Sequence, residues 1–166
     1  YGVTYAYGYD PEGNMFEMEQ LDPEPLAQVE AKLRWIDEGY SMWMTQVALV
    51  THDIERLTNW YADIMAFMPY RTGDYEGHPR MAEVAGEPYL SLLASWFRMD
   101  SRAKTIEIWQ YRDPITPEPT RKKGVTDFGY SYSIEVGDIA TEVVRMSSLG
   151  VEFMSEPVNM GEYHQV

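Results

Sequence analysis

The sequence predicts an α+β fold built from a strand–helix–strand unit that occurs twice. The two copies, Thr45–Phe67 and Ser131–Met154, each begin with an alternating run of residues, which is typical of a half-buried strand. Each run then reaches an aspartate, Asp53 or Asp138, which is a favoured helix N-cap, and apolar residues follow at helical spacing. The two aspartates lie 85 residues apart, as do the strand residues seven places before them, so we interpret the pattern as an internal repeat.

Composition indicates one globular domain and argues against polyanionic partners. The chain has 166 residues, 45% of them hydrophobic, which is enough for a sizeable core. A net charge of −14 argues against nucleic acid or an anionic membrane as partners, because both need clustered cations. The lack of cysteine excludes disulfides, thiolate metal sites and cysteine nucleophiles. No apolar run could span a bilayer and no signal peptide is visible, so we expect a cytoplasmic protein.

The first forty residues predict a hairpin followed by a helix. Tyr1–Asp10 alternates tyrosine and valine with small residues, as a strand does, and Met15–Glu19 is a second strand. Asp10–Asn14 has the proline and glycine chemistry of a turn between them. Leu21–Gly39 has apolar residues at helical spacing and is expected to pack on the outside of the domain.

Three further strands are expected after the helix of the first copy, at Pro69–Thr72, Pro88–Trp96 and Arg102–Gln110. The first copy therefore predicts the order β-α-β-β-β. The polar segment Gly73–Gly86 is expected to be a loop, which would act as a lid over a site. Asp113–Gly124 is rich in proline and charge and is interpreted as a linker.

The ends of the chain suggest a circular permutation. The second copy stops at Val166 without its last two strands, whereas the chain begins with two strands that no helix precedes. Joining Val166 to Tyr1 would complete a second β-α-β-β-β unit, although residues 1–19 could instead belong to a different upstream module. The permuted interpretation gives module one at residues 42–112, module two at residues 125–166 plus 1–20, and a connecting helix at residues 21–40.

These residues resemble a known superfamily. Gln46-Val47-Ala48-Leu49-Val50, Asp53-Ile54 and Ile106-Glu107-Ile108-Trp109-Gln110-Tyr111 resemble one βαβββ module of the vicinal oxygen chelate superfamily, which includes glyoxalase I, extradiol dioxygenases and bleomycin-resistance proteins. The runs EVGDI, LGVEFMSEP and DPEGNMFEME are similar to its second module, and the DPEGN turn before Glu17 is the most specific match. The resemblance implies two βαβββ modules that form an open cup-shaped mixed sheet with helices outside, in a homodimer.

The resemblance also implies a metal site in the cup. In that superfamily one divalent ion is held by a residue on the first strand of each module, usually histidine, and a glutamate on each fourth strand. Carried over by position, the four ligands are Gln46, Glu107, Ser131 and Glu17. Without histidine such a site would bind Zn²⁺ or Fe²⁺ weakly and suit Mg²⁺, Mn²⁺ or Ca²⁺ better. Without a metal, two carboxylates in one cup would repel each other, which would raise at least one pKa and create a general acid/base pair.

Other residues are candidates for the same site. Glu107 lies mid-strand among apolar neighbours, an expensive place for a carboxylate unless it is paired or functional. His164 is the one histidine expected near the cup, as a catalytic residue or ligand, whereas His52 and His78 are expected on the surface. The predicted substrate-pocket residues are Trp109, Tyr132 and Tyr5.

Two functions remain open from the sequence. The first is a small-molecule enzyme, a lyase, isomerase or dioxygenase-like protein, that acts on an apolar or aromatic oxygen-bearing substrate. In it Glu107 or Glu17 is the base or metal ligand, and Gln46 orients a substrate oxygen. The alternative is a metal-free protein of the bleomycin-resistance type, in which the cup only sequesters a small molecule or antibiotic.

Overall fold

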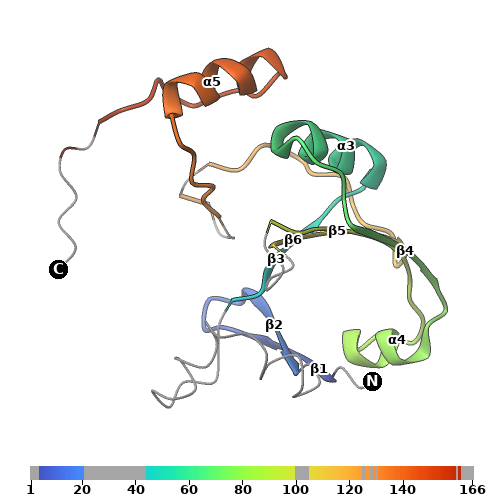
Figure 1. Ribbon diagram of the computed structural model, residues 1–166. Coiled ribbons are helices and arrows are strands. Elements are labelled where there is room, and N and C mark those ends of the chain that lie inside the picture. The colour runs from blue at the N-terminus through green and yellow to red at the C-terminus, as the bar shows by residue number, and fades with distance from the viewer. Residues whose placement is uncertain are drawn as a thin grey trace, which may run out of the picture.

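The computed structural model describes residues 4–20, 44–99, 105–124, 126–127, 129, 131–159 and 161. Within them the chain is α+β, as predicted, with six strands in two sheets and three helices (Figure 1). The helix expected at Leu21–Gly39 and the candidate His164 lie outside the described residues. None of the described helices is long and apolar enough to cross a membrane.

The main sheet has four strands in the order β3-β6-β5-β4. β3 (Gln46–Val50) runs parallel to β6 (Thr105–Asp113), and β5 (Ser91–Phe97) is antiparallel to both β6 and β4 (Arg71–Glu76). The helix α3 (Ile54–Met65) connects β3 to β4. The order β-α-β-β-β predicted for the first copy is therefore present, with one additional helix between β4 and β5.

The alternation of side chains along β6 separates two faces of the sheet. Ile106 and Ile108 are buried against α3, where they pack with Tyr61, Ala62 and Phe97. The residues that alternate with them along the strand are Glu107, Trp109 and Tyr111, which belong to the opposite face. One face of the sheet is thus an apolar core covered by α3, and the other carries the polar and aromatic side chains.

The predicted N-caps are confirmed at both repeated aspartates. The Asp53 side chain accepts a hydrogen bond from the Arg56 backbone N–H at 3.0 Å, and Asp138 accepts one from Thr141 at 3.0 Å. The first backbone N–H of α3, that of Ile54, is satisfied from a distance by Gln110 Oε1 at 2.9 Å. Local capping therefore starts both helices, because it satisfies N–H groups that no helical carbonyl can reach.

The segment Gly73–Gly86 is not the loop that its polarity predicts. It contains most of β4 and a short helix, α4 (Pro79–Ala85), which is capped by the His78 side chain and ends at Gly86 in the left-handed conformation. Proline at the first helical position and glycine after the last are the usual start and stop signals of a helix. Figure 1 shows α4, a helix that the sequence did not predict, on the opposite side of the main sheet from α3.

The predicted N-terminal hairpin is confirmed. β1 (Thr4–Tyr9) pairs with β2 (Met15–Gln20) in an antiparallel two-stranded sheet. Its turn is held by Asp10, whose carboxylate accepts backbone N–H bonds from Glu12 and Asn14 at 2.9 and 2.8 Å. The hairpin lies on the same side of the main sheet as α4 (Figure 1), and β1 contacts α4.

The second copy differs most from its prediction. Its helix α5 (Ile139–Ser148) forms, and Arg145 Nη2 attaches it to the end of α3 by donating to the Ile64 carbonyl at 2.6 Å. The strands expected at Ser131–Val136 and Val151–Met154 do not form, because neither segment pairs with another strand in the part of the chain that is described. The permuted order and the module boundaries remain predictions.

We predict that Phe97→Ala destabilises the protein by about 3–5 kcal/mol, since truncating a fully buried phenylalanine leaves a cavity. Phe97 is 0% exposed and packs against the rings of Tyr61 and Phe67. Urea denaturation measures the loss. Phe153→Ala, at a phenylalanine that is 43% exposed, is the matched control, and equal losses in the two variants would contradict this assignment of the core.

Candidate functional site

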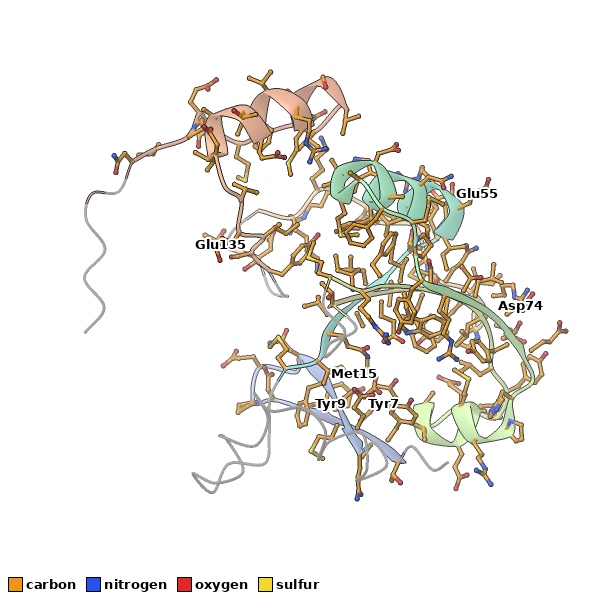
Figure 2. The ribbon with its side chains drawn as sticks, viewed as in Figure 1. Tyr7, Tyr9, Met15, Glu55, Asp74 and Glu135 are labelled. Atoms are coloured by element: carbon orange, nitrogen blue, oxygen red, sulfur yellow. The ribbon has the colours of Figure 1, made fainter. Side chains whose placement is uncertain are left out.

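A pocket of about 560 Å³ lies between the hairpin, α4 and the face of the main sheet that α3 leaves uncovered. This volume suits a small-molecule ligand. Figure 2 shows Tyr7 in the space between β1 and the main sheet. The aromatic side chains that line the pocket are Tyr5, Tyr7, Tyr75, Trp96, Trp109 and Tyr111.

Glu107 is a buried carboxylate in the pocket wall. It is 3% exposed and lies in the middle of β6, opposite Trp96 on β5. The indole Nε1–H of Trp96 donates a hydrogen bond to Oε1 of Glu107, and the amide of Gln46 on β3 donates to Oε2 at 2.6 Å. These two donors offset the cost of burying the carboxylate, which explains how it is tolerated among apolar neighbours.

Gln46 presents its amide N–H to Glu107 rather than its oxygen. This orientation is required because two facing oxygens would repel each other, whereas the amide N–H and the carboxylate form a hydrogen bond. It leaves Oε1 of Gln46 buried with no hydrogen-bond partner among the described residues. The Gln46 amide therefore holds Glu107 in place through its nitrogen, while its oxygen has no hydrogen-bond partner among the described residues.

Glu17 reaches the same pocket from the hairpin. It lies opposite Tyr7 across the β1–β2 pair, and the Tyr7 hydroxyl donates to Glu17 Oε2 at 3.0 Å. Burial, followed by the negative charge of Glu17, raises the pKa of Tyr7 above its ordinary value. Burial also raises the pKa of Tyr111, and the charges of Glu107 and Glu17 both add to that rise. Both tyrosines thus stay protonated and can donate hydrogen bonds. The charges of Glu107 and Glu17 both reach these tyrosines, so the two carboxylates belong to one site.

The structure brings together most of the candidate residues. Glu107, Glu17, Trp109 and Tyr5 all line the pocket, and Gln46 supports it through Glu107.

Ser131 and Tyr132 lie elsewhere. Ser131 is exposed and does not line the pocket. The hydroxyl of Tyr132 contacts the hydroxyl of Tyr61 on α3, so Tyr132 packs on the other side of the main sheet and its assignment to the substrate pocket does not agree with its position.

Further polar residues line the pocket beside the predicted ones. His78 is exposed, as expected, but it also caps α4 and lines the pocket, and Arg71 lines the pocket from the start of β4. The start signals of α4, a possible cap before Pro79 and a glycine at its end, could have indicated the helix. No local signal indicates that Arg71 faces a pocket, since this follows from how β4 pairs with β5.

The donor set does not match the four ligands implied by the resemblance. Gln46, Glu107 and Glu17 come together, but Ser131 does not join them. Both oxygens of Glu107 accept N–H hydrogen bonds, and Gln46 offers an N–H, not its oxygen, to Glu107. Among the described residues, no three His, Asp or Glu side chains are grouped so as to hold a metal ion. A metal at this site stays a prediction, and no chemical step is assigned to it here.

Comparisons with known proteins identify the fold. No protein-family model and no curated protein matches the chain. Among solved structures, the chain is similar to a glyoxalase family protein from Bacillus cereus, with a TM-score of 0.60 and 19% sequence identity. The similarity covers 73% of this chain and 80% of that one. The chain therefore has a glyoxalase-like fold.

We predict that Glu107→Gln destabilises the protein by about 1–3 kcal/mol, because a buried donor would be left unsatisfied. The new NH₂ group would face the N–H of either Trp96 or Gln46, so that two donors would meet. Chemical denaturation measures the change, and Glu12→Gln in the exposed hairpin turn should leave stability as it is. If both variants were as stable as the parent chain, the two hydrogen bonds to Glu107 would not be structural.

We predict that stability decreases as the pH rises above about 10. The pKa values of Tyr7, Tyr61 and Tyr111 are raised from 10.0, chiefly by burial, so the folded state keeps these protons when the unfolded chain has released them. Their contribution to stability is complete below the unfolded pKa and is lost progressively at higher pH. Unfolding free energies from pH 8 to 11 test this. Tyr7→Phe should flatten the decrease, and Tyr9→Phe, at an exposed tyrosine, should not.

Proposed function

We propose that this chain is a vicinal oxygen chelate protein that binds an apolar or aromatic oxygen-bearing small molecule in the pocket and acts on it chemically. The observation that carries the proposal is that Glu107 and Glu17, from distant parts of the sequence, line one aromatic pocket. A pair of carboxylates in one cavity is a common arrangement in general acid/base catalysis. The glyoxalase-like fold supports the proposal but does not by itself indicate a reaction.

Glu17 is the better candidate for the base. Glu107 is almost fully buried, and both of its oxygens are held by N–H donors, so it is suited to a fixed role. Glu17 is only partly buried, and it accepts a hydrogen bond from the Tyr7 hydroxyl. In the proposed step, Glu17 accepts a proton from a ligand O–H group, or from a C–H group next to a ligand oxygen.

One further pocket residue, Tyr111, would support the charge that develops on the ligand oxygen. Tyr111 stays protonated because burial and the two carboxylates raise its pKa, so its hydroxyl can donate to an oxygen that becomes negative. Oε1 of Gln46 is buried and Gln46 does not line the pocket, so its role is to position Glu107 rather than to contact the ligand. A lyase or isomerase reaction that begins with proton abstraction fits these roles best.

The alternative function is sequestration of a small molecule without a reaction. The aromatic wall favours it, because Trp96, Trp109 and Tyr111 pack edge to face and face to face and offer a large apolar surface for a flat ligand. In this case Glu107 and Glu17 would only select the ligand. A homodimer, expected from the resemblance, and a cytoplasmic location remain predictions.

The enzyme and the binding protein respond differently to Glu17→Gln. The variant retains an oxygen that can accept from Tyr7, so it should fold and bind, but it cannot take a proton. For a ligand found by screening phenols and aromatic ketones through tryptophan fluorescence, we expect turnover to fall by about 10²–10⁴-fold with little change in affinity.

Glu12→Gln, in the same hairpin but outside the pocket, is the control and should keep full turnover. Ligands that bind without any turnover in the parent chain would favour sequestration. Turnover that survives Glu17→Gln would exclude Glu17 as the base.

A further inference from the structure

Arg71 places a fixed positive charge in the pocket wall. Its guanidinium lies 4.5 Å from the centre of the Trp96 ring, and its Nη2 donates to the Tyr75 hydroxyl at 2.7 Å. Arg71, Trp96 and Tyr75 all line the pocket. Arg71 is exposed and forms no ion pair with any described acidic residue. It is therefore a cation that aromatic groups hold in place and that no carboxylate of the described residues neutralises.

The fold sets the position of this guanidinium. Arg71 lies opposite Trp96 in the β4–β5 pairing, so the side chains of the two residues share one face of the sheet. Two residues along β4, a Cβ atom at Gly73 would overlap the Tyr75 ring, so glycine allows that ring to fold back along the strand toward Arg71. A planar guanidinium held by an aromatic face and a hydroxyl is preorganised to bind a planar oxyanion.

The charges of the pocket are separated. Trp96 lies between them, because its ring face meets Arg71 while its Nε1–H donates to the buried Glu107. Glu17, whose charge acts on Tyr7 and Tyr111 together with that of Glu107, adds a second negative charge, and α4 contributes one charge of each sign, Arg80 and Glu83. A ligand anion would be attracted to Arg71 and repelled by the carboxylates of Glu107 and Glu17. The charge pattern thus imposes one orientation on a ligand with one anionic end.

We infer that the ligand is an aromatic acid. Its ring lies along the Trp96 and Trp109 wall, its carboxylate or equivalent oxyanion binds Arg71 at the exposed side, and its uncharged end points toward Glu107 and Glu17. This inference rests on the proposed function, because it assumes that the pocket is the ligand site. It adds the chemical class of the ligand and the residue that selects it.

The test compares an acid with its own ester. The probes are 6-hydroxy-2-naphthoate and its methyl ester, which share a flat ring and a hydroxyl but differ in charge, and binding is followed by fluorescence. We expect the parent chain to bind the acid about tenfold more tightly than the ester, because the acid gains one charge-assisted hydrogen-bonded contact with Arg71. Arg71→Gln should abolish this preference, and Arg71→Lys, which keeps the charge but not the planar fork, should retain part of it.

Arg98→Gln is the matched control. Arg98 stacks on the Tyr70 ring at 4.1 Å, in the same way as Arg71 on Trp96, but it does not line the pocket. We expect this variant to keep the tenfold preference for the acid.

The ratio of the acid affinity to the ester affinity shows whether Arg71 selects the ligand or only supports the fold. If Arg71 were only structural, Arg71→Gln would weaken acid and ester equally, and the inference would be wrong. Equal binding of acid and ester by the parent chain would also overturn it while leaving the pocket as a small-molecule site. Binding of neither probe by the parent chain would count against both the inference and the proposed function.

Discussion

The burial of Glu107 in the middle of the main sheet is the constraint on which the site depends. A carboxylate with this little exposure would cost several kcal/mol if nothing donated to it. Two N–H groups that donate to it come from the strands on either side, Gln46 from β3 and Trp96 from β5. Because a shift of one residue in either pairing would turn those donors to the other face, the carboxylate and the strand register support each other.

The same hydrogen bond orients the pocket wall. With its N–H directed at Glu107, Trp96 packs edge to face with Trp109 and presents its ring face to Arg71. One indole therefore connects a buried anion to an exposed cation. The hairpin then places Glu17 and Tyr7 against this wall, and α4 contributes to the remaining side. The result is an aromatic pocket with an acidic interior and a basic residue at its exposed side.

The glyoxalase-like fold does not by itself determine the chemistry of the site. In this fold one face of the main sheet is covered by α3, and the other face lines the pocket. In the superfamily that the sequence resembles, histidines usually stand at the positions of Gln46 and Ser131. Here Gln46 serves Glu107 as a hydrogen-bond donor, and Ser131 lies away from the pocket. The open face is therefore organised by hydrogen bonds between carboxylates, an amide, an indole and tyrosine hydroxyls.

The sequence alone determined the features that depend on neighbouring residues. These are the helix starts at Asp53 and Asp138, the turn after Asp10, and the alternation that turns Glu107 and Trp109 to one face of β6. Capping, turns and side-chain alternation are local, so a pattern in the chain is enough to predict them.

Tertiary structure alone decided that Ser131–Val136 forms no strand, that Tyr132 meets Tyr61, and that Arg71 stacks on Trp96. A strand needs a partner, and these contacts join residues far apart in the chain. Each is therefore chosen by packing that the alternation of a single segment does not encode.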